Sequence, residues 1–305
     1  METVAHVGEA GVIHRLTQRL GHRARSPSVL VGIGDDTAVL PWTSTEHLLF
    51  ASDMLVEGVH FRLSHVPPRW IGWKALACNV SDVAAMGGVP TYAVVSLGIP
   101  PRTPVRFVDE LYTGVKRCAE RFDIAVVGGD TVRAPVIVVD VAILGTVKIS
   151  HLVLRSGARI GDRVFVTGRL GGSLASGRHA TFLPRAREAQ WLVRRLKVHA
   201  MIDLSDGLAS DLWQLARASR VTFRVHERQI PVSRAGRTSW HALMDGEDFE
   251  LLFAVPSRLA RRVPTRIGQV PVTEIGVVTK HGAHVELVRS NGRLTPLLPE
   301  GFRHF

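Results

Sequence analysis

The sequence has 305 residues, of which 46% are hydrophobic and 21% charged, a composition that is typical of a folded globular protein and excludes a disordered one. Its net charge of +11 would suit a nucleic-acid-binding protein, but the arginines are dispersed and no RNP motif, basic zipper or zinc finger accompanies them, so a basic surface that attracts anionic ligands is the better interpretation. No stretch approaches the roughly 20 apolar residues of a membrane span or the apolar core of a signal peptide, and the isolated Cys78 and Cys118 favour the reducing cytoplasm over a disulfide framework or a zinc site.

The predicted elements alternate between strands and helices in two halves. In the first half we expect, in chain order, a strand in 47–61, a helix over 68–86, a strand over 91–100, a helix over 106–122, a strand and turn over 123–130 and a strand over 135–147. In the second half we expect a strand over 162–168, a glycine-rich turn at 168–177, a basic helix ending near 198, a strand, turn and helix over 200–219, and strands over 249–255 and 272–278. This pattern predicts a two-domain α/β (α+β) protein, with one domain at 1–147 and the other at 148–305.

Aspartates recur where predicted strands end. They follow apolar runs in the segments GIGDD, LLFASDM, AVVGGD and AMIDLSD, as Asp35, Asp36, Asp53, Asp130, Asp203 and Asp206. Each alone could be an ordinary turn residue. Carboxylates gathered at strand ends repel one another unless a cation neutralises them, and Mg²⁺ prefers oxygen ligands that it shares with phosphates. The repeated arrangement therefore favours a polyphosphate and magnesium site.

Asp82 adds evidence of another type. In the predicted helix over 68–86 it lies opposite an apolar stripe, yet its neighbours on that side are also apolar. A carboxylate on a helix covered on both sides needs a partner, which is either a metal ion or a buried salt bridge.

Two further signals are weaker. In the glycine-rich turn, Gly168, Gly171 and Gly172 either offer amides to an anion or form a plain loop. His60 either lies near the expected site or is an ordinary packed histidine.

Taken together, these segments resemble the thiamine-monophosphate kinases, a family of the aminoimidazole-ribonucleotide-synthetase-like superfamily. The resemblance follows nearly the whole chain in order, from GEAGVI through GIGDDTAVL, SDMLVEGVHF, WKALACNVSDVAAMGGVP, VVGGDTVR, LVLRSGARIGDRVFVTGRLGGS, AMIDLSDGLASDL and DGEDFELLF to IGVV. The combination of NVSDVAAMG, IDLSDGL and GEDFEL is the most specific part.

The resemblance implies ATP-dependent phosphorylation of thiamine monophosphate to thiamine diphosphate. It also implies a homodimer in which two N-terminal mixed sheets join into a barrel, with ATP and several Mg²⁺ ions in the cleft at that interface. By position, the implied magnesium ligands are Asp36, Ser52, Asp53, Asp82, Asp130, Asp203 and Asp206. The implied nucleotide contacts are Gly129, Asp130, Arg155 and Ser205, and the implied contacts to thiamine monophosphate are His60 and Glu247.

No covalent nucleophile of the protein is expected, because the phosphate of thiamine monophosphate can attack the γ-phosphate of ATP directly while metal ions neutralise the repulsion. Three positions depart from the pattern of the family. Ser52 replaces a frequent threonine, Asp245 replaces a usual glycine, and Pro299 stands where an aromatic residue commonly stacks on thiamine. Phe302 or Phe305 is an alternative for that stacking.

Two other interpretations remain open. One is another ATP-using member of the superfamily, although the chain lacks the C-terminal cysteine of the hydrogenase-maturation dehydratases and the early mobile cysteine of selenophosphate synthetases. The other is a catalytically silent nucleotide-binding relative, which should have lost some of the aspartates that this sequence retains.

Overall fold

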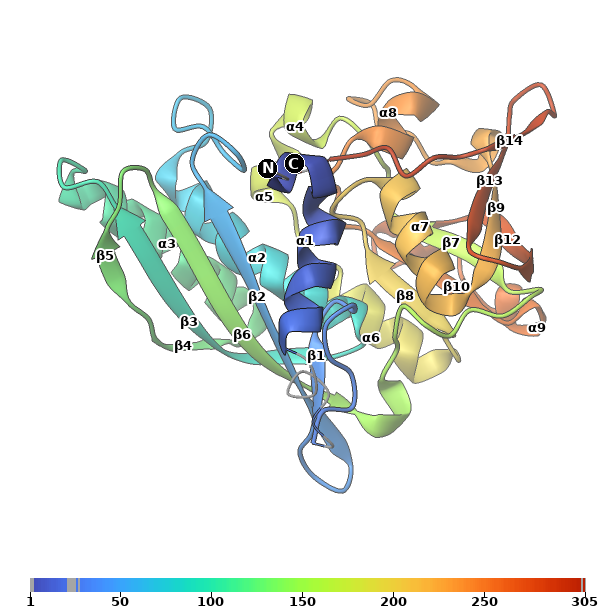
Figure 1. Cartoon of the computed structure of the whole chain (residues 1–305), viewed down its shortest axis with the longest axis horizontal. Coiled ribbons are helices and arrows are strands. Elements are labelled where there is room, and N and C mark those ends of the chain that lie inside the picture. Colours follow the sequence, from blue (N-terminus) through green and yellow to red (C-terminus); the bar gives the residue numbers. More distant parts are fainter. Residues whose placement is uncertain (1–2, 21–25, 27, 303, 305) are drawn as a thin grey trace.

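Two mixed sheets, each with helices packed beside it, make up the part of the chain that the computed structural model describes, residues 3–20, 26, 28–302 and 304 (Figure 1). The predicted two-domain α/β class is confirmed. Within the described residues neither sheet closes on itself, so the barrel across a dimer stays a prediction. The first sheet ends at Lys148 and the second begins at Arg163, and the expected domain boundary between residues 147 and 148 likewise stays a prediction.

The first sheet has the strand order β1-β2-β6-β3-β4, with β5 also pairing with β3. Its central strand β6 shows why the chain is extended here: Val139, Val141 and Ile143 are buried, and they alternate with half-buried residues at the period of a strand. The strands are β1 (Ala38–Pro41), β2 (Glu46–Val56), β3 (Val89–Ile99), β4 (Ala125–Gly128), β5 (Thr131–Arg133) and β6 (Val138–Lys148).

The second sheet has the strand order β14-β13-β9-β12-β7-β10-β8, with β11 pairing with β12. Strand β10 is buried at every residue and is a continuous apolar run, as expected for a strand covered on both faces. The strands are β7 (Arg163–Thr167), β8 (Ala200–Asp203), β9 (Val221–His226), β10 (Leu251–Val255), β11 (Arg266–Ile267), β12 (Val270–His281), β13 (His284–Val288) and β14 (Leu294–Pro296).

The helix α2 lies between the first sheet and the second half of the chain. It is buried around most of its circumference, and the indole nitrogen of Trp73 donates to the carbonyl oxygen of Phe182 in the second half (2.8 Å). The helices are α1 (Val4–Leu20), α2 (Pro68–Ala85), α3 (Val105–Phe122), η2 (Ile149–His151), α4 (Ser173–Ser176), α5 (Arg178–Thr181), α6 (Ala186–Arg195), α7 (Leu208–Ser219), η3 (Glu227–Gln229), α8 (Ser239–Met244) and α9 (Ser257–Ala260).

Two glycines bring α2 and α3 into close contact. A Cβ atom on Gly72 would lie 1.9 Å from the carbonyl oxygen of Leu111, and one on Gly114 would lie 1.7 Å from that of Arg69. Only glycine allows such an approach, so these positions set how closely α2 and α3 pack. In the described ranges, no helix has the length and apolar character needed to span a membrane.

Candidate active site

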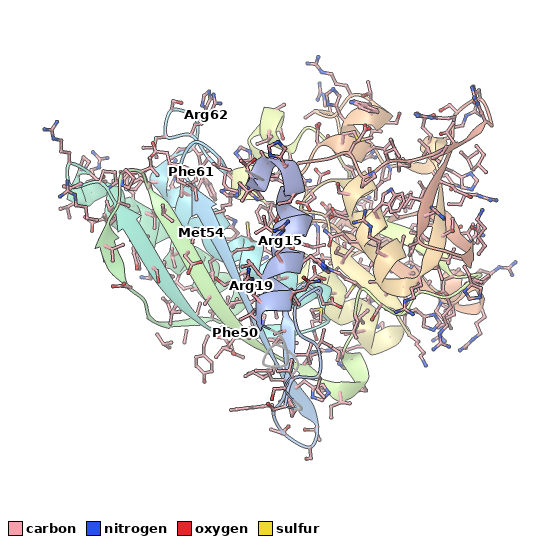
Figure 2. The ribbon with its side chains drawn as sticks, in the orientation of Figure 1. Arg15, Arg19, Phe50, Met54, Phe61 and Arg62 are labelled. Carbon is pink, nitrogen blue, oxygen red and sulfur yellow. The ribbon has the colours of Figure 1, made fainter. Side chains whose placement is uncertain are left out.

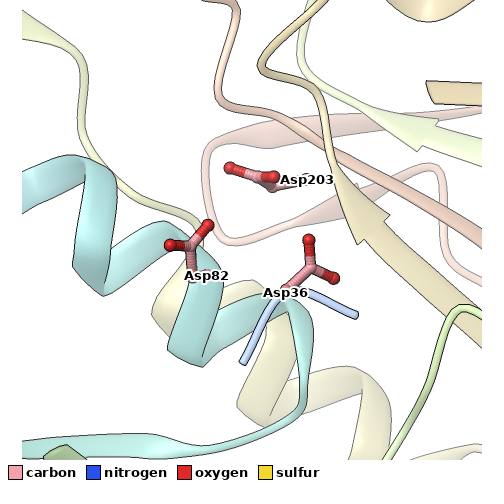
Figure 3. A group of neighbouring side chains, drawn as sticks. All are labelled: Asp36, Asp82 and Asp203. Atoms are coloured by element: carbon pink, nitrogen blue, oxygen red, sulfur yellow. The ribbon is translucent and has the colours of Figure 1, made fainter. Parts of the chain in front are cut away.

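Three aspartates from distant parts of the chain meet in a cleft of about 860 Å³ that both halves of the protein line. Asp36 precedes β1, Asp82 lies in α2 and Asp203 ends β8. One carboxylate oxygen of each lies within 4.8 Å of the others (Figure 3). We call these three residues the cleft aspartates. The structure thus brings together three of the metal ligands that the sequence predicts.

The surroundings of the cleft aspartates disfavour their charged forms. Desolvation, reinforced by the charge of Asp36, raises the pKa of Asp203 to about 8. Desolvation and the charges of Asp53 and Asp203 raise the pKa of Asp82 well above its ordinary value. Desolvation also raises the pKa of Asp36, although the Arg155 guanidinium opposes the rise. The surroundings therefore favour the protonated forms of these carboxyl groups, unless a cation replaces the protons.

The donor set fits a hard divalent cation. Asp36 Oδ2 is buried and has no hydrogen-bond partner among the described residues, while Arg155 Nη2 donates to Asp36 Oδ1 (2.6 Å). Ser81 Oγ donates to Asp203 Oδ2 (2.6 Å) and helps to fix that carboxylate. Magnesium prefers such carboxylate oxygens, and the excess of negative charge needs neutralising. The cleft aspartates can therefore hold a divalent cation.

Several further predicted residues line the same cleft. Desolvation, together with the charges of Asp140 and Asp36, raises the pKa of Asp53 to about 6. The hydroxyl of Ser52 donates to Asp140 Oδ1 on the neighbouring strand β6 (3.0 Å). The lining residues in this part of the cleft are Ser52, Asp53, Arg155, Ser205 and Asp206.

Asp35 has a different role from its neighbour Asp36. Its carboxylate accepts the backbone N–H of Asp36 (3.0 Å) and that of Arg155 (3.1 Å). It therefore ties the turn before β1 to the segment that carries Arg155. The two adjacent aspartates therefore have different roles: Asp35 fixes the turn, and Asp36 faces the other cleft aspartates.

Gly129 and Asp130 are the predicted site residues that the structure does not bring into this cleft. They lie between β4 and β5, and the strands β6 and β3 separate them from Asp53 in β2. Both are exposed. Gly129 has a φ of 155°, and a Cβ atom there would lie 1.7 Å from the carbonyl oxygen of Val95, so close packing against β3 already requires glycine.

His60 and Glu247, the predicted substrate contacts, both line the cleft and are joined by Lys74. Lys74 Nζ donates to the carbonyl oxygen of His60 (2.9 Å) and forms an ion pair with Glu247. His60 Nδ1 accepts the N–H of Val56 (3.0 Å), so the proton of the neutral ring is on Nε2. Desolvation and the charges of His304 and Lys74 lower the pKa of His60 to about 4, which keeps the ring neutral near pH 7.

The C-terminal tail returns to this end of the site. The ring centroid of His304 lies 5.1 Å from that of His60 and 4.9 Å from that of Phe302, and both tail residues line the cleft. Pro299 lines an adjoining pocket between α1 and α7. Of the two alternatives for the stacking aromatic, Phe302 is thus placed in the cleft, and Phe305 lies outside the described residues.

Of the two alternatives for the glycine-rich turn, an anion cradle or a plain loop, the hydrogen bonds of its amides support the plain loop. The N–H of Gly171 donates to Asp248 Oδ2 (2.8 Å), that of Gly172 to Asp245 Oδ2 (2.7 Å), and that of Gly168 to the carbonyl oxygen of Pro271 (2.8 Å). All three donors are therefore occupied by protein acceptors. Asp245, which departs from the family pattern, helps to hold the turn against the loop that carries Glu247.

Sequence reasoning missed Lys74 and Asp140. Lys74, Cys78 and Asp82 follow one another at intervals of four along α2, so helical spacing placed Lys74 on the face of Asp82 and could have identified it. Asp140 carried no such signal, because its position beside Ser52 depends on the register between β2 and β6.

Comparisons with known proteins agree with this geometry. Residues 34–147 match the AIR synthase related protein, N-terminal domain, and residues 159–288 match the AIR synthase related protein, C-terminal domain. The thiamine-monophosphate kinase of Rhodopirellula baltica is 37% identical over 303 aligned positions, which cover 93% of this chain and 94% of that protein. That of Bacillus subtilis is 33% identical and covers 97% of this chain and 99% of its own.

A solved structure described as AaThiL complexed with AMPPCP and TMP has a TM-score of 0.86 and 32% identity to this chain, and the match covers 100% of this chain and 99% of that one. The similarity extends over both sheets and the cleft between them, so the expected family resemblance is confirmed. The chain belongs to the thiamine-monophosphate kinases, within the AIR synthase related proteins, and is an enzyme of that kinase family.

Proposed function

We propose that this protein transfers the γ-phosphoryl group of ATP to thiamine monophosphate, which yields thiamine diphosphate and ADP. The names of the relatives support this acceptor, and the neighbour solved with AMPPCP and TMP supports both substrates. The observation that carries the proposal is the convergence of the cleft aspartates, whose buried carboxylates have raised pKa values and too few protein cations. Such a site suits the anionic phosphates of a nucleotide when metal ions accompany them.

Magnesium ions are part of this proposal. Held by Asp36, Asp82 and Asp203, with Ser52, Asp53 and Asp206 beside them, they would neutralise the charge of the two phosphate groups that must approach each other. Arg155 provides a fixed positive charge next to Asp36 and, with Ser205, faces the nucleotide. His60 and Glu247 contact thiamine monophosphate.

We propose direct in-line transfer. An oxygen of the thiamine monophosphate phosphate bonds to the γ-phosphorus, the bond from that phosphorus to the bridging oxygen breaks, and the electron pair leaves on the β-phosphate of ADP. A phosphate monoester is largely ionised near neutral pH, so no strong base is needed. Cys78 lines the cleft, but desolvation and the charge of Asp53 raise its pKa well above the ordinary value, so its thiol stays protonated and is no nucleophile.

We also propose that the protein acts as a dimer formed through the outer face of the first sheet. Three large apolar side chains are exposed on strands of this face: Phe50 is 46% exposed, Met54 53% and Tyr92 53%. Figure 2 labels Phe50 and Met54 along β2. Exposed apolar side chains in one sheet face favour pairing with another protein surface. Gly129 and Asp130 lie away from the cleft of their own chain, and we propose that they reach the nucleotide in the cleft of the partner copy.

Other expectations stay predictions. These are the cytoplasmic location, the division between residues 147 and 148, and the lack of a nucleic-acid partner.

A product assay tests the proposed function. The protein is incubated with ATP, thiamine monophosphate and Mg²⁺, and the products are identified by mass spectrometry. We expect thiamine diphosphate and ADP in equal amounts, and no such product from free thiamine or in excess chelator. Failure to form thiamine diphosphate overturns the function, and a trapped phosphorylated enzyme overturns direct transfer alone.

Subunit complementation tests the shared site. Asp82→Asn and Asp130→Asn are each expected to lose activity by orders of magnitude. If Asp130 acts in the partner's cleft, mixing the two inactive variants under conditions of subunit exchange restores about a quarter of wild-type activity, because half of the dimers then contain one intact site. A mixture as inactive as its components shows that Asp82 and Asp130 act within one chain.

A further inference from the structure

Lys74 is a lysine in an unusual place. It lies in the middle of α2, its side chain is 1% exposed, and the helix residues around it, such as Ile71, Ala75 and Cys78, are buried and apolar. Lysine is rarely buried this completely, because its ammonium loses its hydration unless the protein provides partners. The partners of Lys74 therefore indicate why the residue is there.

Both of its partners belong to the proposed binding site for thiamine monophosphate. The ammonium forms an ion pair with Glu247, in the loop between α8 and β10, and donates to the carbonyl oxygen of His60, in the loop after β2 (2.9 Å). The Lys74 ammonium thus connects a loop of the first half of the chain to a loop of the second half. These two loops are far apart in the sequence.

The conformation of Glu247 needs such support. Its φ is 61°, in the left-handed region that residues with a side chain rarely adopt. Its N–H donates to the carbonyl oxygen of Ser205 (2.7 Å), and its own carbonyl oxygen accepts from Ser173 Oγ (2.6 Å). These bonds fix the backbone, while the ion pair with Lys74 fixes the carboxylate. The Glu247 side chain is 18% exposed and lines the cleft.

We propose that Lys74 is a positioning residue that sets the affinity for thiamine monophosphate by holding the Glu247 carboxylate and the His60 loop in place. This inference rests on the proposed function. The ion pair uses Glu247 Oε1, which leaves Oε2 for an amino or cationic group of the substrate's ring system. The cleft aspartates, which serve the nucleotide and its metal ions, are not contacts of Lys74.

The test separates the two substrates. Lys74→Met removes the ammonium and keeps an unbranched side chain at the same buried position. We expect the KM for thiamine monophosphate to rise about tenfold or more, as for the loss of a charged hydrogen bond, while the KM for ATP changes by less than about twofold. Lys74→Arg, which keeps the charge, should recover part of the affinity. Lys116→Met is the matched control, because Lys116 in α3 is 74% exposed and should show no effect.

A double-mutant cycle shows whether Lys74 acts through Glu247. If it does, Lys74→Met combined with Glu247→Gln binds thiamine monophosphate no more weakly than Glu247→Gln alone. Fully additive effects, or equal losses for ATP and thiamine monophosphate, overturn the positioning role. If Lys74→Met does not fold, the same comparison is made with Lys74→Gln and Lys74→Arg, and an unchanged KM for thiamine monophosphate in a folded variant also overturns it. Wild-type protein that forms no thiamine diphosphate contradicts the proposed function instead, so the two failures are distinguishable.

Discussion

Two groups of acidic side chains in the protein interior have their charges balanced in different ways. Besides the cleft aspartates it contains Asp248 and Glu250, each with a side chain 1% exposed, which we call the arginine-bound acids. Arg178 donates to Asp248 (2.7 Å) and to Glu250 (3.1 Å), and Arg185 donates to Glu250 through Nε (2.5 Å). Among the residues that the structure describes, the cleft aspartates have one such partner, Arg155, on Asp36.

This difference separates acids that stabilise the fold from acids that can bind a cation. The arginine-bound acids carry their own cations, and they also accept hydrogen bonds from Gly171 and Thr167. They hold the loop that contains Glu247 against the second sheet. The cleft aspartates retain an unpartnered buried oxygen on Asp36 and mutual repulsion, which a cation from solution can relieve. Several uncompensated carboxylates that converge on one cleft therefore distinguish the candidate site from the arginine-bound acids.

The largest expected effect comes from Asp82→Asn. This change removes one cleft carboxylate without changing its size, so kinase activity should fall by about a thousandfold, equivalent to ~4 kcal/mol of lost transition-state stabilisation. Stability without Mg²⁺ should stay equal or rise, because a repelling charge is gone. Coupled ADP release and urea unfolding measure the two quantities.

The counterpart for the arginine-bound acids is Arg185→Met, which should lower stability and leave the Mg²⁺ requirement unchanged. It leaves Glu250 buried with only part of its compensation, so the free energy of unfolding should fall by about 3–5 kcal/mol, while the Mg²⁺ concentration for half-maximal activity stays unchanged. Near-normal activity in Asp82→Asn, or a shifted Mg²⁺ requirement at unchanged stability in Arg185→Met, would remove the distinction between the groups.

The second prediction uses pH. Asp203 has a pKa of about 8 in the folded, metal-free protein, above the value of 3.8 expected for an unfolded chain, and Asp53 has one of about 6. The folded state then binds more protons than the unfolded state between about pH 4 and pH 8, so stability without metal falls as pH rises through that range. Magnesium replaces these protons, and its stabilising effect should grow from pH 6 to pH 8.5.

Urea unfolding at several pH values, with Mg²⁺ and with a chelator, measures this effect. Asp203→Asn should flatten the pH dependence of the metal-free protein. Desolvation also raises the pKa of Asp248 to about 6, but its partner is Arg178, so its contribution should be the same with and without Mg²⁺. Magnesium stabilisation that is independent of pH contradicts the prediction.

Much of the fold could be predicted, because periodicity is a local property. The helix expected over 68–86 is α2, and the apolar neighbours of Asp82 correctly indicated that both of its sides are covered. The order of the strands could not be predicted in the same way. Strand β6 inserts between β2 and β3 through packing between residues far apart in the chain. This strand order separates Asp130, which lies between β4 and β5, from Asp53 in β2.

The candidate site could likewise be predicted only where its signals are local in the sequence. Aspartates at strand ends indicated the cleft aspartates, because β8 and the turn before β1 bring such ends to one place. The sequence could not decide between an anion cradle and a plain loop for the glycine-rich turn, because the acceptors of Gly171 and Gly172 come from residues 245–248, more than 70 positions away. A motif shows which donors exist, whereas tertiary structure decides which of them remain unused.

The smallest expected effects come from removing one hydroxyl beside each group. Ser81 Oγ donates to Asp203 and lowers its pKa, so Ser81→Ala should raise that pKa further and increase the Mg²⁺ concentration for half-maximal activity by about three- to tenfold, because protons then compete better with the metal. Thr167 Oγ1 donates to Glu250 (2.7 Å), and Thr167→Val should lower the free energy of unfolding by about 1 kcal/mol without changing the Mg²⁺ requirement. Magnesium titrations and urea unfolding of both variants measure these effects. Equal changes in the Mg²⁺ requirement would mean that the two groups of acids are coupled through the protein, because neither hydroxyl touches the other group.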